Sequence, residues 1–258
     1  YNYVTKEDVQ KRNQTIEQNA TKVDFQWNGE IKLRDYQVAC VDKTIHSLKN
    51  TCGAIVNLST GAGKSYCGCR VIAQMKKKAL IVVHKQFLSE EFKKSIDLCM
   101  PGTSVSYIQG PRVDFSGDIV IAMMQTLVSK DWDKEVFNQF GVVCFDETHR
   151  VCAHTWIRSV LNLDSVMIIG LSATVQRKDG LKPQWLVGEI AFKYDNTSKN
   201  SPQVYVIDYK DEKPIDFVFN RAGTANLPVF INNLTKDPDR NSLIIETLEK
   251  LYIKNEED

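Results

Sequence analysis

The chain has no long apolar run. No stretch approaches the ~20 consecutive apolar residues that cross a bilayer, and residues 1–8 lack the character of a signal peptide. These absences argue against a membrane partner and against secretion. We therefore expect an intracellular, soluble protein, in either the nucleus or the cytoplasm.

The sequence also has no C-x-x-C pair, although it has seven cysteines. An odd number of scattered cysteines neither implies disulfides nor fits a zinc site. Cys67 and Cys69 stand two apart on a predicted helix and would not share a face. We expect free thiols in a reducing compartment. The cysteines are Cys40, Cys52, Cys67, Cys69, Cys99, Cys144 and Cys152.

A strong charge of one sign is absent as well, because 33 Lys and Arg face 32 Asp and Glu, for a net charge of +1. Such a balance does not indicate a polyanionic partner, so any binding of nucleic acid must be local. Three lysines at 76–78 stand between a predicted helix and a predicted strand. There they favour a helix C-terminus, and we expect them to stay in solvent.

An alternation of apolar strands, turns and helices begins near residue 31. With 43% hydrophobic residues in 258, the chain suits one large domain, or one domain plus part of another. The alternation predicts an α/β fold with a mainly parallel sheet and helices on both faces. The predicted strands are 53–58, 79–83, 104–108, 118–123, 141–146 and 166–171.

The two ends of the chain differ from this middle part. Residues 1–30 form a polar arm, partly helical, to which we assign no chemistry. A turn-rich break at 195–202 is followed by a predicted strand at 204–209 and a capped amphipathic helix at 243–252. We therefore divide the chain into an arm (1–30), a first domain (31–200), and a linker with the truncated start of a second domain (201–258).

Residues 57–65 resemble a phosphate-binding loop between a buried strand and a helix. Small residues let the backbone approach a polyphosphate, Lys64 supplies charge near the outer phosphates, and Ser65 offers a hydroxyl to magnesium. Leu58 departs from the pattern G-x-x-x-x-G-K-[ST], so an ordinary turn with a solvated lysine remains an alternative. The predicted nucleotide-binding residues here are Thr60, Gly61, Ala62, Gly63, Lys64 and Ser65.

A second polar sequence follows the predicted strand at 141–145. A buried carboxylate is costly unless it faces a cation or a partner, so Asp146 and Glu147 at a strand end indicate a magnesium site. Asp146, with Ser65, would hold the ion, and Glu147 would orient and deprotonate an attacking water. The alternative is a strand that runs into an acidic loop.

The order of these motifs resembles the superfamily-two helicases and translocases, and within them the branch typified by the XPB helicase. The run from Gly170 to Leu181, which contains Arg177-Lys178-Asp179-Gly180, is similar to XPB-like proteins and their viral relatives. The other matching segments are Leu33 to Gln37 (Q-type motif), Leu58 to Ser65 (motif I), Ala79 to His84 (motif Ia), Ile119 to Leu127 (motif Ib and its neighbour), the DEAH-type box Asp146 to His149 (motif II) and Leu171 to Thr174 (motif III).

The resemblance implies a RecA-like P-loop NTPase domain in which the motif III strand lies between the other two. Arg34 and Gln37 would then contact the adenine, although a Gln at a helix start can also be purely structural. His149, Ser172 and Thr174 would couple the nucleotide to the nucleic-acid surface. Phe25 or Trp27 could stack on the base, but we favour a role in anchoring the arm.

The resemblance also points to a nucleic-acid track, formed by Lys85, Gln125 and Thr126. Their charge, amide and hydroxyl would contact phosphates without reading sequence, and the alternative is that they are solvated loop residues. Two residues depart from the family pattern, namely Val175, where many relatives have proline, and Thr148, where many have Ala or Cys. We expect altered coupling at most.

From this resemblance we expect ATP hydrolysis with Mg²⁺, coupled to movement along nucleic acid, with DNA favoured over RNA. The family's arginine finger comes from a second RecA-like domain, which would be this chain's partner, so the chain alone should hydrolyse ATP poorly. A P-loop kinase or GTPase is one alternative. A nucleic-acid-binding scaffold with residual nucleotide binding is another.

Overall fold

The computed structural model describes residues 5–150, 166–175, 180, 182–195, 206, 208, 218–220 and 223–256. The chain divides into two units, residues 1–197 and residues 198–258, and each is described by itself. The sequence placed this boundary between residues 200 and 201. Within the described ranges, no helix has the length and apolar character needed to cross a membrane.

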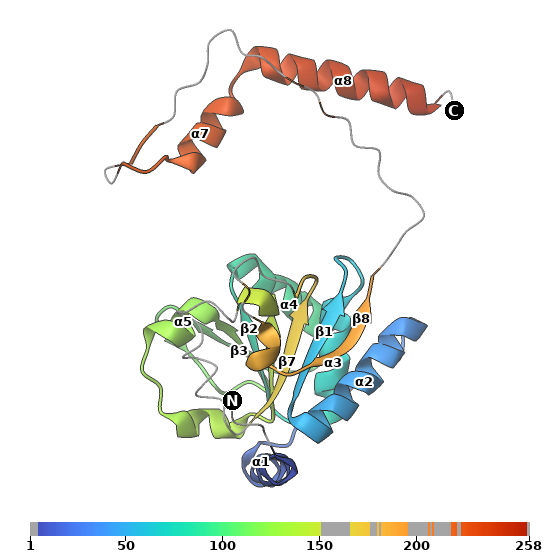
Figure 1. The fold of residues 1–258 in the computed structure, drawn as a ribbon, viewed down its shortest axis with the longest axis vertical. Helices are drawn as coiled ribbons and strands as arrows, with labels where there is room; N and C mark the ends of the chain where they lie inside the picture. Colours follow the sequence, from blue (N-terminus) through green and yellow to red (C-terminus); the bar gives the residue numbers. More distant parts are fainter. Residues whose placement is uncertain are drawn as a thin grey trace. The chain divides into compact units, whose positions relative to one another are not determined.

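Buried parallel strands form the centre of the first unit (Figure 1). The sheet order is β4-β3-β5-β2-β6-β7-β1-β8, and only the pair β3 and β4 is antiparallel. Its central strands are apolar up to their carboxyl ends, because a parallel strand covered on both faces has no side that meets water. The bounds are β1 Gly53–Leu58, β2 Ala79–Val83, β3 Val105–Gln109, β4 Arg112–Val113, β5 Ile119–Met123, β6 Val142–Asp146, β7 Met167–Ser172 and β8 Ile190–Tyr194.

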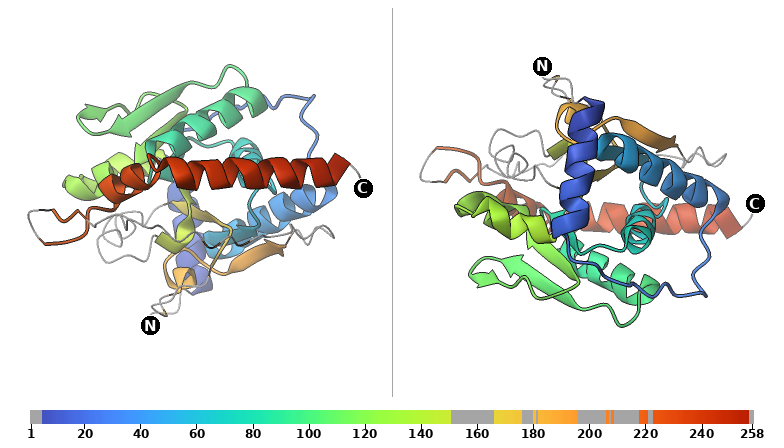
Figure 2. Two further views of the ribbon diagram at one scale, coloured as in Figure 1. Left: turned by 90° about the horizontal axis from the view of Figure 1, so that it is seen from above. Right: turned by 90° about the horizontal axis from the view of Figure 1, so that it is seen from below.

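Helices cover both faces of this sheet, as the sequence predicted (Figures 1 and 2). On one face, Leu48 of α2, Ile72 of α3 and Ile96 of α4 belong to one buried apolar cluster. On the other face, Leu127 of α5 and Phe137 of η1 belong to a second cluster. The bounds in the first unit are α1 Lys6–Asn19, α2 Asp35–Thr51, α3 Lys64–Met75, α4 Gln86–Cys99, α5 Met124–Ser129 and the 3₁₀ helices η1 Lys134–Gln139, η2 Thr148–Arg150 and η3 Pro183–Trp185.

The predicted strands lie within one residue of the observed ones, but β4 and β8 were missed. β4 has only two residues, too few for a periodic signal. β8 is an outer strand, with side chains that range from half-buried to exposed, so it lacks the apolar run that marked the others. The strand predicted at 204–209 lies mostly outside the described residues.

The expectation that residues 76–78 stay in solvent is wrong for two of the three lysines. Lys77 and Lys78 are each 7% exposed. The Lys77 ammonium lies 2.8 Å from Oε2 of Glu17 in α1. The Lys78 ammonium donates to the carbonyl of Phe115, and burial lowers its pKa. The arm and the loop before β5 cover these side chains, which no local pattern in the sequence could indicate.

The six cysteines in the described ranges are free and buried, as the sequence predicted. Their side chains fill the space between the helices and the sheet, with Cys40 on α2, Cys67 on α3 and Cys144 on β6 among them. Cys152 lies outside the described residues.

The second unit contains helices α7 (Leu227–Leu234) and α8 (Pro238–Glu256). Oδ1 of Asp237 accepts hydrogen bonds from the backbone N–H groups of Asp239 at 3.0 Å and Arg240 at 3.1 Å. This side chain caps the start of α8. The helix predicted at 243–252 lies inside α8 and begins five residues later than the observed one.

Candidate active site

The loop between β1 and α3 has the strand-turn-helix setting that a phosphate site requires. Residues 59–63 lead into the first turn of α3, where backbone N–H groups face outward from the helix start. Gly61 and Gly63 have φ values of 77° and 81°, a left-handed conformation that favours glycine. A Cβ atom on Gly63 would lie 2.4 Å from Nε2 of Gln37. Gly63 is therefore required both by its backbone and by its neighbour.

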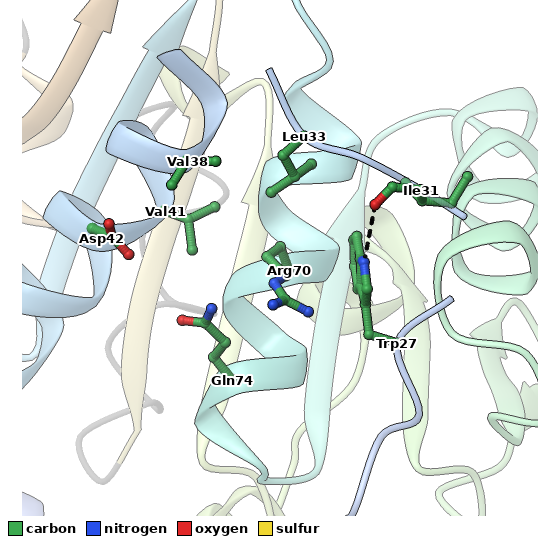
Figure 3. A pocket seen from close by; sticks show the side chains of 8 residues that line it. All are labelled: Trp27, Ile31, Leu33, Val38, Val41, Asp42, Arg70 and Gln74. Atoms are coloured by element: carbon green, nitrogen blue, oxygen red, sulfur yellow. Dashed lines mark hydrogen bonds between the residues drawn. The ribbon is translucent and has the colours of Figure 1, made fainter. Parts of the chain in front are cut away.

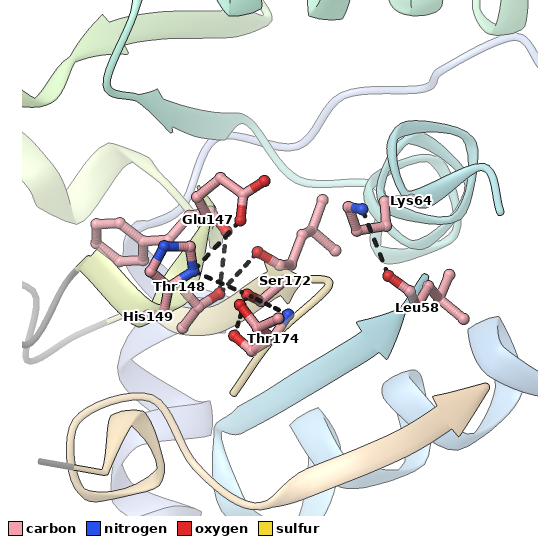
Figure 4. Close-up of polar contacts among 9 residues, drawn as sticks. Leu58, Lys64, Glu147, Thr148, His149, Ser172 and Thr174 are labelled. Carbon is pink, nitrogen blue, oxygen red and sulfur yellow. Dashed lines mark hydrogen bonds and ion pairs between the residues drawn. The ribbon is translucent and has the colours of Figure 1, made fainter. Parts of the chain in front are cut away.

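Leu58, the departure from the strict phosphate-loop pattern, is the last residue of β1. Its side chain is fully buried in the core. Its carbonyl oxygen accepts a hydrogen bond of 3.4 Å from the ammonium group of Lys64, which reaches back across the loop (Figure 4). The core thus holds the leucine side chain that stands where the pattern has glycine, and the loop itself begins after Leu58.

The start of α2 packs directly on the phosphate loop. Gln37 is 8% exposed, and its Nε2 donates to the carbonyl of Ala62 at 3.0 Å. Its Oε1 accepts from the backbone N–H of Arg34 at 2.9 Å. Gln37 thus joins the loop to the helix start, and its predicted contact with adenine, like that of Arg34, stays a prediction.

Two tyrosines that the sequence did not single out also support this loop. The hydroxyl of Tyr36 donates to the carbonyl of Ala62 at 3.0 Å, and its ring stacks on that of Tyr194, with centroids 4.0 Å apart. The carbonyl of Tyr194 accepts from the N–H of Ser59 at 3.2 Å. Tyr36 was visible within the Q-type motif, whereas Tyr194 lies on the unpredicted strand β8.

Asp146 and Glu147 follow β6 at the carboxyl edge of the sheet. Burial, and after it the negative charge of Glu147, raise the pKa of Asp146 to about 6, against a backbone hydrogen bond from Glu147 and the charge of Lys64, which lower it. Glu147 has a φ of 51°, which is uncommon for a residue with a side chain. The turn therefore combines a carboxyl group that resists ionisation with a strained backbone.

The predicted coupling residues form one hydrogen-bonded group at the ends of β6 and β7 (Figure 4). Nδ1 of His149 lies 3.3 Å from Oε2 of Glu147 and 3.2 Å from Oγ of Ser172. The hydroxyl of Ser172, which is fully buried, donates to the carbonyl of Thr174 at 2.5 Å. Its oxygen is therefore left to accept from His149. The role of this group in coupling stays a prediction.

The sheet order explains why distant sequences meet here. β7 lies between β6 and β1, as the resemblance implied. Asp146 on β6 pairs with Leu171 on β7, and the next residue, Ser172, pairs with Asn57 on β1. The loop, the acidic turn and the polar end of β7 thus meet at one edge of the sheet, where ligands bind in open α/β sheets.

These residues fit a magnesium–nucleotide complex. Gly61 and Gly63 give the loop its left-handed backbone, a Cβ atom on Gly63 would meet Gln37, and Lys64 is the first residue of the helix that follows. Asp146 is a partly buried carboxyl group with a raised pKa, and a bound cation would favour its charged form. The residues that would hold the ion are Ser65 and Asp146, as predicted from the sequence.

The structure brings only some of the predicted nucleic-acid residues together. Lys85 is exposed at the start of α4, and the side-chain amide of Gln125 donates to the carbonyl of the preceding residue, His84, at 2.8 Å. Thr126 is 6% exposed, and its hydroxyl accepts from the N–H of Gly110 at 2.9 Å. The Thr126 hydroxyl thus already has a partner inside the protein. Contact with nucleic acid stays a prediction for all three residues.

The arm packs against the first unit through its aromatic side chains. Phe25 is 9% exposed and belongs to the core cluster. The ring of Trp27 lies 4.7 Å from the guanidinium group of Arg70, and its Nε1 donates to the carbonyl of Ile31 at 3.2 Å (Figure 3). This geometry supports the anchoring role that the sequence favoured. The pocket beside Trp27, of about 190 Å³, is lined by Trp27, Ile31, Leu33, Val38, Val41, Asp42, Arg70 and Gln74.

Part of the run that pointed to the XPB-like branch lies outside the described residues. Arg177, Lys178 and Asp179 all fall there, and so does Gln176. Gly180, at the end of the run, has a φ of 74°. Val175 is 9% exposed and packs in the cluster beneath α5.

Comparison with known proteins gives one match to a family model. The model described as type III restriction enzyme, res subunit, matches residues 30–177, which is more than half of the 258 residues. The matched range includes the loop, the acidic turn and the polar end of β7.

Two viral proteins are among the similar sequences. A candidate ATP-dependent RNA helicase of Acanthamoeba polyphaga mimivirus is 25% identical over 226 residues, which cover 85% of this chain and 44% of that protein. A candidate helicase of Invertebrate iridescent virus 6 is 24% identical over 231 residues, which cover 88% of this chain and 51% of that protein. The chain therefore spans about half the length of these relatives.

Solved structures share the fold. The UvsW helicase from bacteriophage T4 superposes with a TM-score of 0.54 at 24% identity, over 71% of this chain and 67% of that chain. The SWI2/SNF2 ATPase core of Sulfolobus solfataricus, in complex with double-stranded DNA, gives a TM-score of 0.52 at 15% identity, over 66% and 38%. The expected RecA-like α/β fold is thereby confirmed.

Proposed function

Because the chain belongs to the family of type III restriction enzyme res subunits, we propose that its first unit is the ATP-hydrolysing motor domain of a superfamily-two helicase or translocase. Its work is to couple hydrolysis of Mg-ATP to movement on nucleic acid or to remodelling of a duplex. The assignment to the XPB-like branch is part of this proposal and rests on the motif order and the run at 177–180.

One observation carries the proposal. His149 lies within 3.3 Å of both Glu147 and Ser172, so the acidic turn is tied to the motif III strand. A P-loop kinase or GTPase needs the loop and the acid but has no use for this tie. A scaffold without catalysis would not need Lys64 and Glu147 at the same sheet edge.

Each residue then has a definite role. The N–H groups of the loop and the ammonium group of Lys64 bind the phosphates, and Ser65 and Asp146 hold Mg²⁺. When bound, the ion neutralises charge on the outer phosphates. Glu147 orients a water and takes its proton while the water oxygen bonds to the terminal phosphorus and the bond to the ADP oxygen breaks.

The nucleic acid on which the motor moves is either DNA or RNA. We favour DNA, on the resemblance to the XPB-like branch. The mimivirus relative, named as a candidate RNA helicase, favours RNA instead. ATP turnover measured with single-stranded DNA, duplex DNA and RNA of equal length decides between them, and the strongest stimulation identifies the track.

We further propose that residues 1–258 alone hydrolyse ATP slowly. In the family, an arginine from a second RecA-like domain typically contributes about 10³ to 10⁵ in rate. A version extended at its carboxyl end, with that domain, should turn over ATP much faster in the presence of nucleic acid. Equal rates for the two chains would refute this proposal.

Glu147→Gln is the direct test of the catalytic assignment. The amide keeps the size of the side chain but cannot accept the proton, so kcat should fall by at least about 100-fold. Binding of ATP, followed by fluorescence of a labelled analogue, should change little. Glu30→Gln, an exposed carboxylate in the arm, is the matched control. Unchanged turnover in Glu147→Gln would rule out Glu147 as the base.

A further inference from the structure

Thr148 sits at the centre of the acidic turn, directly after the proposed base. It is 1% exposed. Its hydroxyl donates to the carbonyl of Leu171 on β7 at 3.0 Å and lies 3.4 Å from the carbonyl of Phe145 on β6 (Figure 4). A residue that departs from the family pattern therefore links the two strands that flank the catalytic turn.

The facing position on β7 is Gly170. A Cβ atom there would lie 2.5 Å from Oγ1 and 2.6 Å from Cγ2 of Thr148, far inside van der Waals contact. Gly170 is not among the described residues with positive φ, so its backbone does not require glycine. The closeness of Thr148 is what requires it, and the threonine side chain occupies the space that a methyl group on β7 would fill.

The residue before Thr148 carries the strain. Glu147 has a φ of 51°, which a residue with a Cβ atom adopts only when its surroundings hold it there. Two contacts hold the backbone that follows the Glu147 Cα atom: the N–H of Arg150 donates to the Glu147 carbonyl at 2.9 Å, and the Thr148 hydroxyl fixes the next residue to β7.

We propose that Thr148 is a positioning residue for the hydrolysis reaction, and that Gly170 is the socket into which it fits. The Thr148 side chain pins the strained turn to β7 and so fixes the direction of the Glu147 carboxylate. This inference rests on the proposed function, because it concerns the aim of the same base. It adds two residues for which the sequence predicted no role beyond altered coupling.

The acidic turn is thus attached to β7 at two points. The carbonyl of Leu171 holds Thr148, and the hydroxyl of the next residue, Ser172, holds His149. A shift of this strand end would therefore move the backbone of the turn as well as its histidine. In this arrangement the position of Glu147 depends on β7, and not only on β6, the strand on which the acidic sequence begins.

The first experiment removes the hydroxyl while keeping the volume. Thr148→Val should lower kcat for ATP roughly 10- to 100-fold, the loss expected from a slightly misplaced catalytic group, with KM for ATP nearly unchanged. Thr148→Ser keeps the donor and should retain most of kcat. Thr44→Val is the matched control, since Thr44 is also fully buried and donates to a backbone carbonyl, that of Cys40 at 2.7 Å.

The Thr44→Val control separates a loss of catalytic positioning from a loss of stability. Both valine variants lose a buried hydrogen bond and should be destabilised to a similar degree. Only Thr148→Val should lose kcat. If kcat of Thr148→Val stays at the wild-type value, or if Thr44→Val loses as much, Thr148 is an ordinary core residue and the inference fails.

The second experiment tests the socket. Gly170→Ala drives a methyl group into Thr148 and should lower both kcat and the melting temperature. Adding Thr148→Ala removes Oγ1 and Cγ2 and leaves the Cβ atom of residue 148 at 3.1 Å from the new methyl group, so the double variant should recover most of the way to the level of Thr148→Ala alone. Gly29→Ala, where a Cβ atom would meet nothing within 4 Å, should be neutral. Simple addition of the two single effects in the double variant would overturn the pairing.

The outcomes distinguish this inference from the function on which it rests. A wild-type chain without ATP turnover, alone or extended, contradicts the proposed function. A wild-type chain with turnover that is insensitive to Thr148→Val contradicts the positioning role only. Melting temperatures of the Gly170 and Thr148 variants test the socket in either case, because they need no hydrolysis.

Discussion

The phosphate loop and the acidic turn both end a buried strand, but their shapes are held in different ways. The loop reaches left-handed backbone conformations with Gly61 and Gly63, which adopt them without strain. The acidic turn reaches one with Glu147, which does not. The loop's shape is therefore encoded locally, whereas the shape of the turn depends on contacts with β7.

Substitutions in the loop and on β7 should therefore have different effects. A change inside the loop should act directly on nucleotide binding. A change on β7, far away in the sequence, should act on catalysis through the turn. The predictions below test this contrast, from the largest expected effect to the smallest.

Gly63→Ala should have the largest effect on nucleotide binding. The new Cβ atom meets Nε2 of Gln37 at 2.4 Å and strains a φ of 81°, so the Gln37 amide that holds the loop, or the loop itself, must move. We expect a roughly 10- to 100-fold weaker affinity for ATP, which corresponds to about 1–3 kcal/mol of strain. Calorimetric titration with a non-hydrolysable ATP analogue measures it.

Gly102→Ala is the control that separates strain from contact. Gly102 has a φ of 82°, yet a Cβ atom there would meet nothing within 4 Å. It should lower the melting temperature through its backbone alone and leave the ATP affinity unchanged. Equal ATP affinities for Gly63→Ala and Gly102→Ala would show that the loop does not bind through this geometry.

The pH dependence of Mg²⁺ binding should reveal the buried acid of the turn. The pKa of Asp146 is raised to about 6 in the folded chain, above its ordinary value of 3.8. Protons therefore compete with the ion below pH 6, and the apparent Mg²⁺ affinity should rise up to about tenfold per pH unit there and level off above it. Mg²⁺ titrations of ATP-analogue binding between pH 5 and 8 measure this.

The sign of the same shift gives a second check. Because the folded state holds the proton more tightly than the unfolded state, the free energy of unfolding without Mg²⁺ should fall as the pH rises from about 4 to about 6. Asp146→Asn should remove this contribution. A stability that rises across this window in the wild type, relative to Asp146→Asn, would contradict the assignment of the shift.

Tyr36→Phe should have the smallest effect. It removes the hydroxyl that donates to the carbonyl of Ala62, but Gln37 still donates to the same carbonyl. The ring stack with Tyr194 is kept. ATP affinity should weaken by less than about fivefold, because a neutral hydrogen bond contributes about 1 kcal/mol. A loss as large as that of Gly63→Ala would mean that the hydroxyl, and not the glycine, shapes the loop.

The sequence predicted the central part of the fold well, for a physical reason. Strands such as β2 and β5 are buried between layers of helices and are therefore apolar throughout, a pattern that needs no knowledge of their neighbours. β8 is half exposed and its pattern is ambiguous, so it was missed together with Tyr194.

The candidate site was predictable in its residue types but not in its contacts. The polar motifs that hold Lys64, Asp146 and Ser172, and the resemblance of their order to a known family, indicated a nucleotide site, and the sheet order brings their strands together. The fit of Thr148 to Gly170, by contrast, depends on packing between η2 and β7, which are far apart in the sequence. Burial of Lys77 by Glu17 depends likewise on packing that no local pattern expresses.

The position of β8 has a mechanical consequence. This strand pairs with β1 at the edge of the sheet, and the carbonyl of Tyr194 accepts the N–H of Ser59, the first residue of the phosphate loop. Only residues 195–197 separate Tyr194 from the start of the second unit at Ser198. A displacement of the end of β8 would therefore act on the first residue of the phosphate loop through the hydrogen bond between Tyr194 and Ser59.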